Sequence, residues 1–508
     1  MNARVGIVLA ALFVVASSSS MAADDPAPPA VTDRESALDR LKRVQEALQA
    51  KDYAAAAATL DAVFAADFDN LAPGLRHSAL LFATFVAIGR EDLLTAHEYA
   101  VAATSLSDAR ADEWALRASI ALEVQNFGDA AFSLKTLAEQ WPAKLHQFAG
   151  QTIYSLSTSM SHDPQLAQAR MDLIAALFDA KYTAEYGFEP AYLWSELAAA
   201  LLEKNRPELA LKVLERIDDP KLLARMRVDR RFDALVAAKP SAFDIASAAK
   251  ARCRQLHELM GKYPRDLQPV IEYMYAQFTV GAFKEIIELA DQILTSVRRA
   301  PKDQPPFDEL ESKLNWIYDI KAHALRARGR WKQSLEVQEK ARSMRNNSAD
   351  KVSQAINLGF FFNEHGEPAK ALQALEGIDW GHSLSGYGRM QLEHVRLRAL
   401  LQLGRRDEAE TVLSYLRQNQ KDAPDTWQTA LLDWGDADGA AALYIARLRD
   451  PQQRPEALWA AQIFPSTPTL PMEEEADSRW NALLARQDVA AAIDEVGRRE
   501  KMPIYLIE

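Results

Sequence analysis

The sequence predicts an all-α protein, built as a superhelical array of antiparallel helix pairs. Three observations carry this prediction. The residues Ala, Leu, Glu, Arg and Gln, which favour helices, dominate the chain. No segment after Arg34 shows the alternating pattern of a strand. Short turns that contain one Gly or Pro recur along the chain. With 508 residues, 48% of them hydrophobic, the chain has ample material for a packed core, which excludes disorder throughout.

Composition excludes several classes of function. A single cysteine, Cys253, excludes an intramolecular disulfide framework and any zinc or iron–sulfur site built on cysteines. A formal net charge of -12 argues against nucleic acid as the main ligand, because phosphate binding requires a basic face. We expect no metal and no cofactor.

The first 23 residues have the pattern of a secretory signal peptide. Arg4 precedes an apolar run from Val5 to Ala16, and small residues near Ala23 offer a cleavage site. We therefore expect cleavage near Ala23 and a periplasmic or secreted protein, with an uncleaved anchor as the alternative. Residues 24–33 read as a linker rich in proline. No other segment approaches the length of a membrane span, so we expect no stable membrane insertion of the mature chain.

The predicted turns share one pattern. A turn residue, often Gly, for which a left-handed conformation is cheap, ends the first helix of a pair, and a small or apolar anchor lies five residues further on. The small anchor allows the two helices to approach closely. The turn residues are Lys51, Gln125, Asn205, Gly281, Gly329, Gly366 and Gly404. The corresponding anchors are Ala56, Ala130, Ala210, Ile286, Ser334, Ala371 and Ala409.

This pattern resembles the tetratricopeptide repeat (TPR), a helix–turn–helix unit of about 34 residues. The best copy covers residues 111–144, and its matching positions are Trp114, Ala118, Ala121, Ala130, Leu134, Leu137 and Pro142. Spacing is irregular: Ala96 and Ala130 are 34 residues apart, whereas Ser334 and Ala371 are 37 apart. A degenerate copy is expected around Ala169. The resemblance implies a divergent TPR-like α-solenoid, and a non-repetitive helical bundle is the alternative.

The breaks between helical segments predict an order of blocks. The N-terminal TPR-like repeats cover 34–145 and are followed by degenerate helical repeats at 146–300. A linker at 301–306 precedes the C-terminal TPR-like repeats at 307–450. Residues 451–508 are expected to be capping helices, as terminal repeats of solenoids usually are.

We find no catalytic constellation. The nine histidines form no HExxH motif, and there is no phosphate-binding glycine loop. The stretch 377–389 holds four glycines and includes His382, Ser383 and Ser385, but its spacing is not that of a nucleophile loop. It is read either as a loop that folds over a ligand or as a tolerated insertion. The basic stretch 226–232 is read as a charge-paired helix surface in preference to an anion site.

In the TPR family, side chains of the first helix of each pair line a concave groove. The resemblance therefore implies a peptide groove, whose candidates are Trp316, Asp319, His323, Arg326, Phe360, Asn363, His394 and Arg398. Aromatic rings would bury area, and polar groups would fix the register of a peptide. The alternative for each residue is a solvated or packed helix face. The two-carboxylate clamp of chaperone-binding members is absent, because Ala115 and Ser119 stand at its positions.

Together these features predict an exported, non-catalytic scaffold that binds a protein or peptide partner in the cell envelope. The alternative is a small-molecule receptor or hydrolase, with its site near the 377–389 loop and with His382, His394 and Arg398 as its residues. A third hypothesis is self-association through the apolar tail from Ile504 to Ile507.

Overall fold

A computed structural model describes residues 36–65, 68–301, 303–343, 348–376 and 384–507. The predicted signal peptide at 1–23 and the linker at 24–33 lie outside the described residues. So do His382 and Ser383 of the 377–389 stretch. Within the described ranges no helix is long and apolar enough to cross a membrane.

The described chain is all-α, as predicted, and its only strand-like features are three isolated bridges. It divides into two compact units, Met1–Leu197 and Ala198–Glu508. The boundary falls inside α10 (Ala191–Glu203), within the block predicted at 146–300. Each unit is described separately below.

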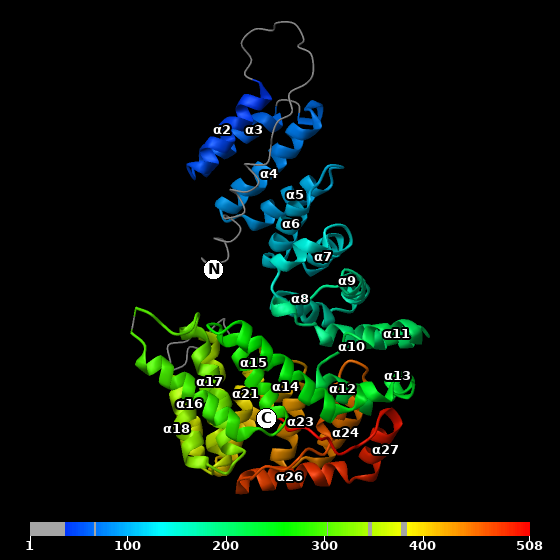
Figure 1. Ribbon diagram of the computed structural model, residues 1–508, viewed down its shortest axis with the longest axis vertical. Coiled ribbons are helices and arrows are strands. Elements are labelled where there is room, and N and C mark those ends of the chain that lie inside the picture. The colour runs from blue at the N-terminus through cyan, green and yellow to red at the C-terminus, as the bar shows by residue number, and fades with distance from the viewer. Residues whose placement is uncertain (1–35, 66–67, 302, 344–347, 377–383, 508) are drawn as a thin grey trace. The chain divides into compact units, whose positions relative to one another are not determined.

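In the first unit, each helix packs against its neighbours in the chain, so helix pairs recur (Figure 1). The pair of α6 and α7 corresponds to the best TPR-like copy in the sequence. The helices preceding α10 are α2 (Ala37–Gln49), α3 (Tyr53–Ala65), α4 (Pro73–Gly89), α5 (Leu93–Thr104), α6 (Ala111–Glu123), α7 (Phe127–Gln140), α8 (Gly150–Ser161) and α9 (Ala167–Asp179).

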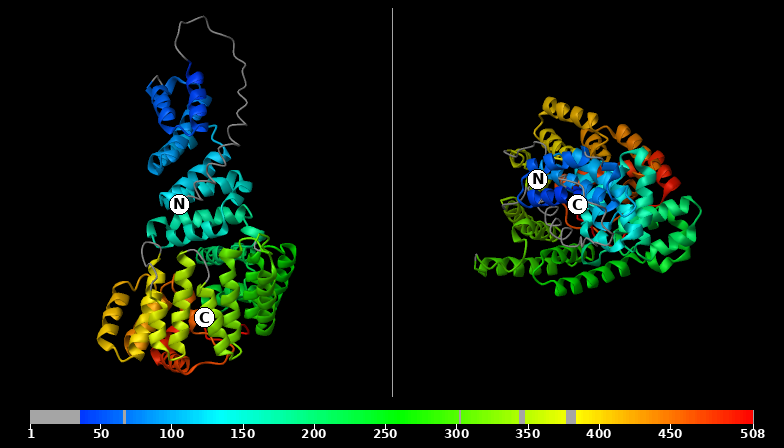
Figure 2. Two further views of the ribbon diagram at one scale, coloured as in Figure 1. Left: turned by 90° about the vertical axis from the view of Figure 1, so that its left-hand side faces the viewer. Right: turned by 90° about the horizontal axis from the view of Figure 1, so that it is seen from above.

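In the second unit helix length varies from six residues in α13 to eighteen in α14, and Figure 2 shows α17 to α22 standing side by side. Its first part contains α11 (Pro207–Leu214), α12 (Pro220–Val228), α13 (Asp233–Ala238), α14 (Ile245–Lys262), α15 (Leu267–Thr279) and α16 (Phe283–Arg299). The TPR-like part contains α17 (Leu310–Arg326), α18 (Trp331–Ser343), α19 (Ser348–Glu364), α20 (Pro368–Ala374), α21 (Gly386–Gln402) and α22 (Arg406–Gln418). The last helices are α23 (Pro424–Trp434), α24 (Ala437–Arg449), α25 (Arg454–Ala460), α26 (Pro471–Leu484) and α27 (Gln487–Val496).

The turn chemistry predicted from the sequence is confirmed. All seven predicted turn residues have a positive φ, between 54° at Asn205 and 78° at Gly281. The next residue donates its N–H to a carbonyl five positions earlier, as in the 2.8 Å bond from Asp52 to Ala47, which closes the helix end. Glu91, Lys181 and Gly435 form further turns of this kind.

The anchors after these turns are also where the sequence places them. All seven predicted anchors, from Ala56 to Ala409, have an exposed fraction of 0%. Ser334 satisfies its buried hydroxyl by donating to the carbonyl oxygen of Ala322 at 2.7 Å. The degenerate copy differs, because Ala169 is only half-buried, and Leu173 and Ile174 fill the core of α9 instead.

The predicted linker at 301–306 joins two helices of one core. Its neighbours α16 and α17 both contribute to a single hydrophobic cluster, through Ile286 and Ile317 among others. Asp308, just beyond the linker, donates its N–H to the carbonyl oxygen of Arg265 at 2.8 Å. The segment is therefore a connection within the second unit and does not separate two domains.

The C-terminal segment does more than cap the last helix pair. Helix α27 packs on α24, as a cap would, but α25 packs on α12 and α26 packs on α19 (Figure 1). The chain after α27 continues this closure, because Arg498 and Tyr505 donate their N–H groups to Val228 and Thr279 at 2.9 and 3.0 Å. Residues 451–507 thus join the early and late helices of the second unit.

The basic stretch 226–232 takes part in this closure. Arg231 forms an ion pair with the buried Asp229, and Arg230 donates to the carbonyl oxygen of Asp494. Just before the stretch, Arg225 forms an ion pair with Glu456. The interpretation as a charge-paired surface is confirmed, and its charges hold the C-terminal segment.

Candidate functional site

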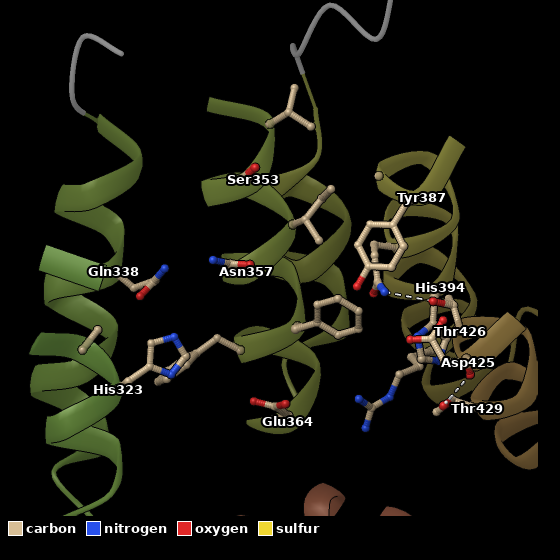
Figure 3. A pocket seen from close by; sticks show the side chains of 18 of the residues that line it. His323, Gln338, Ser353, Asn357, Glu364, Tyr387, His394, Asp425, Thr426 and Thr429 are labelled. Carbon is tan, nitrogen blue, oxygen red and sulfur yellow. Dashed lines mark hydrogen bonds between the residues drawn. The ribbon is translucent and has the colours of Figure 1, made fainter. Parts of the chain in front are cut away.

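The second unit encloses a cavity of about 670 Å³, called the first cavity below, between the facing helices α17, α19, α21 and α23 (Figure 3). Five of the eight candidate groove residues line it: His323, Arg326, Phe360, His394 and Arg398. These side chains come from three successive helix pairs, so the repeat brings distant parts of the sequence together. In Figure 3, His323 faces the cavity from one side, and His394, Asp425 and Thr426 lie on the other.

The other three candidates do not line the cavity. Trp316 is partly buried against the hydrophobic cluster shared by α15, α16 and α17. Asp319 is buried and accepts hydrogen bonds from Gln338 at 3.0 Å and from Asn357 at 3.4 Å, two residues that do line the cavity. Asn363 is fully buried and donates to the carbonyl oxygen of Val395 at 2.9 Å. Asp319 and Asn363 therefore stabilise the wall of the first cavity from positions behind the lining side chains.

One cluster of charges connects α21 to α23 and α26. Asp433 Oδ2 lies 2.8 Å from His394 Nε2 and 3.8 Å from Arg398 Nε, and its Oδ1 accepts from Arg479 at 2.9 Å. Burial alone would raise the pKa of Asp433, but the hydrogen bond from His394 and the two arginines outweigh it, so the pKa is lowered. The ring of Phe360 meets His394 edge to face, with the ring centroids 5.6 Å apart.

A second cluster lies at the deep end of the first cavity. Arg326 forms ion pairs with Glu364, at 2.8 Å, and with Glu473 of α26. Burial raises the pKa of Glu364, although Arg326 and Arg398 act against it. Burial lowers the pKa of His323, against the pull of Asp319, so His323 is neutral at pH 7. The cavity wall is thus a mixture of charged, amide and aromatic groups.

Sequence reasoning missed several lining residues, among them Gln338, Glu364, Asp425 and Thr429. Glu364 lies eleven residues, or about three helical turns, after the lining residue Ser353, so the two side chains share one face of α19. The helical period therefore predicts Glu364, and not Asn363, as the lining residue. Asp425 and Thr429 belong to α23. The turn at Gly435 and the fully buried Ala440 repeat the turn-and-anchor pattern and would have identified this helix pair.

The described end of the 377–389 stretch lies at the first cavity. Ser385, Tyr387 and Gly388 line it. The Ser385 hydroxyl accepts the N–H of Gly388 at 3.1 Å and so serves as the cap at the start of α21. Across the described ranges, no group of three or more His, Cys, Asp or Glu side chains is placed to hold a metal ion.

A second cavity of about 670 Å³ adjoins the first and shares His323, Arg326, Glu364 and Arg398 with it. Helices α23, α24 and α26 form its walls together with the segment 463–469. Residues 505–507 of the C-terminal tail also line it. Within the predicted tail Ile504 is buried in its own chain, and residues 505–507 are half-buried.

The positive-φ turns, the buried anchors and the facing first helices are all in place. The described chain is an all-α array of repeated helix pairs, the architecture that the resemblance to TPR proteins led us to expect. No family model and no curated protein sequence matches it.

Solved helical proteins are similar at low identity. A TPR domain of P58(IPK) is 13% identical and covers 82% of this chain and 99% of its own, with a TM-score of 0.21. The structure of Naa15/Naa10 bound to HypK-THB is 15% identical and has a TM-score of 0.24; the match covers 90% of this chain and 79% of that one. The APC/C heterotetramer Cut9–Hcn1 is 11% identical and also has a TM-score of 0.24; the match covers 90% of this chain and 96% of that one. At these TM-scores the TPR-like architecture rests on the local helix pairs described above.

Proposed function

We propose that this protein is a non-catalytic helical-repeat scaffold that binds an extended peptide segment of a protein partner in the first cavity. The proposal rests on one observation: side chains from three helix pairs converge on one cavity, namely those of His323, Phe360, His394 and Arg398. A repeat array presents such a surface through side chains of successive units, without any catalytic group.

The chemistry of the cavity suits a peptide backbone. Asn357, Gln391 and Thr426 line it with amide and hydroxyl groups that can donate to carbonyls or accept from N–H groups. Phe360 offers an aromatic face for an apolar side chain. The Arg398 guanidinium lies at the junction of the two cavities. Its ion pair with Asp433 is long at 3.8 Å, which leaves it able to donate to a carbonyl or carboxylate oxygen of the ligand.

We further propose that residues 1–23 direct export, so that the partner is a protein of the cell envelope. The charged start, the apolar run and the small residues before Asp24 support this. Mass spectrometry of the protein purified from the envelope fraction tests it. An N-terminus near Asp24 is expected, and recovery of the intact Met1 form from the cytoplasm would contradict export.

Partner binding is tested by affinity capture from an envelope extract with the wild type and with Phe360→Ala/Arg398→Ala. Glu410→Ala, on the exposed outer face of α22, is the matched control. We expect the cavity variant to lose partners that the wild type and the control retain. All three proteins should show a cooperative thermal unfolding transition. Recovery of the same partners by all three would show that the first cavity does not bind them.

A second candidate function is a small-molecule receptor or hydrolase, favoured by the position of Ser385 and Tyr387 at the first cavity. Because the Ser385 hydroxyl caps α21, a receptor fits this geometry better than a serine hydrolase does. Screening ester, glycan and peptide substrates discriminates between the two hypotheses. Sustained turnover that His394→Ala abolishes would overturn the non-catalytic scaffold.

A further inference from the structure

The second cavity contains a buried arginine that has no carboxylate partner in the described chain. Arg447, on α24, is 5% exposed and lines the cavity. Its Nη1 donates to the Oε1 of Gln428 at 2.6 Å, and Gln428 is uncharged. Arg447 Nε is buried without any partner, and among the described residues Arg447 forms no ion pair.

One of the two unused donors can reach the cavity. Nε is buried inside the wall, whereas Nη2 is neither buried without a partner nor hydrogen-bonded to another described residue, so it can donate to a carboxylate oxygen. The bond from Nη1 to Gln428 fixes the plane of the guanidinium and so orients Nη2. A buried charge without a partner is unfavourable, so an anion that supplies the missing acceptor is favoured.

The other charged groups that line the cavity do not fill this role. Glu456 is held by both terminal nitrogens of Arg225. Glu364 and Glu473 are held by Arg326. Asp425 and Asp477 also line the cavity, and neither forms an ion pair with Arg447. Burial lowers the pKa of Arg447, and Asp425 and Glu456 act against this through space without contacting it. None of these carboxylates therefore accepts a hydrogen bond from Arg447.

Five aromatic residues contribute to the wall, beside polar and aliphatic ones. Trp459 and Phe464 meet edge to face, with ring centroids 4.8 Å apart. Trp480 packs edge to face on the buried Tyr444 and donates its indole N–H to the carbonyl oxygen of Ala460. Phe278 and Tyr505 contribute further rings to the lining. These rings favour the burial of an apolar or aromatic group.

We propose that the second cavity binds a small molecule that carries a carboxylate and an apolar or aromatic part, with Arg447 as the anchor of the carboxylate. The site does not depend on peptide binding in the first cavity. Its volume of about 670 Å³ lies within the range of small-molecule sites.

Two probes of the same size test the site on the full chain, 3-phenylpropionate and its uncharged amide, 3-phenylpropanamide. Titration calorimetry should show that the carboxylate binds with a Kd of about 1 mM, and that the amide binds at least about tenfold more weakly. Arg447→Gln, which keeps a donor for Gln428, should abolish the preference for the carboxylate. Arg449→Gln removes the same charge from an exposed position of the same helix and should bind as the wild type does.

Arg447→Lys covers the case in which Arg447→Gln fails to fold, because it keeps the charge and loses the planar guanidinium that Gln428 orients. It should weaken binding of 3-phenylpropionate by about tenfold. Equal binding of the two probes by the wild type would overturn the proposal. So would no binding of 3-phenylpropionate, or unchanged binding by the Arg447 variant that folds.

Discussion

His394 and Asp433 lie 39 residues apart in the chain, yet their side chains meet at 2.8 Å and join the first helices of two successive pairs. Asp433 also forms ion pairs with Arg479 at 2.9 Å and, more loosely, with Arg398 at 3.8 Å, so one buried carboxylate serves three cationic or polar neighbours from α21 and α26. The same contact sets one wall of the first cavity, because His394 and Arg398 line it. Stability and the candidate site therefore depend on one residue.

Asp433→Ala should lower the free energy of unfolding of the second unit by about 3 kcal/mol, because it leaves buried positive charge without a partner. Asp433→Asn keeps an acceptor for His394 and should cost less. Urea unfolding monitored by circular dichroism measures both variants. Equal stability of Asp433→Ala and the wild type would show that the cluster contributes nothing.

Gly359 allows α19 and α21 to approach closely. A Cβ at this position would lie 2.7 Å from Val395 Cγ1, which is too close for an ordinary contact. We expect Gly359→Ala to destabilise the protein by about 1–3 kcal/mol. Gly261→Ala is the matched control: a Cβ there meets nothing within 4 Å, and α14 should gain about 0.5–1 kcal/mol. Thermal melts that rank the two variants in the reverse order would contradict the packing of α19 on α21.

His77 makes the first unit sensitive to pH. Its Nε2 lies 2.6 Å from the buried Glu113, and its Nδ1 lies 3.2 Å from Asp108. The contact with Glu113 raises the pKa of His77 against the effect of burial. A raised pKa means that the folded state holds the proton more tightly, so the stabilisation is complete below about pH 6.5 and is lost as the pH rises through the folded-state value.

The stability of wild type and His77→Gln, measured at a series of pH values, tests this sign. The advantage of the wild type should shrink as the pH rises from 6 toward 8. NMR titration of the His77 ring gives its pKa directly. A value below that of an unfolded histidine would contradict the arrangement with Glu113.

Ile504 fastens the C-terminal tail inside the second unit. It is fully buried, and Met502 beside it donates its N–H to the carbonyl oxygen of Ile463 at 2.8 Å. Ile504→Ala should cost about 2–4 kcal/mol. Ile507→Ala, at a half-buried position of the same tail, should cost less. Light scattering on both variants tests self-association. If the tail bridged two molecules, Ile504→Ala would become monomeric and its stability would stay unchanged.

The helix pairs could be predicted because their signals are local. A turn residue such as Gly404 and an anchor such as Ala409 lie five residues apart, and each imposes its own geometry. The inward faces were harder to predict, because a shift of one position turns a side chain by about 100° around the helix axis. Asn363 therefore points into the helix interface, whereas Glu364 points into the cavity.

The second cavity could not be predicted, because it depends on contacts between distant parts of the chain. Arg498, for example, donates to the carbonyl oxygen of Arg227, 271 residues earlier. No local sequence pattern predicts a contact between two residues so far apart in the chain. Arg447 likewise reads in the sequence as an ordinary residue of an amphipathic helix, and only its burial beside Gln428 identifies it.

The most direct test of the central claim, peptide binding in the first cavity, is photo-crosslinking in the native envelope. A benzoylphenylalanine replaces Ser353, which lines the cavity, or Glu410 on the outer face of α22. We predict that the Ser353 position crosslinks to one contiguous segment of a partner protein and that the Glu410 position does not. Crosslinks from Glu410 alone, or the same set from both positions, would contradict the account.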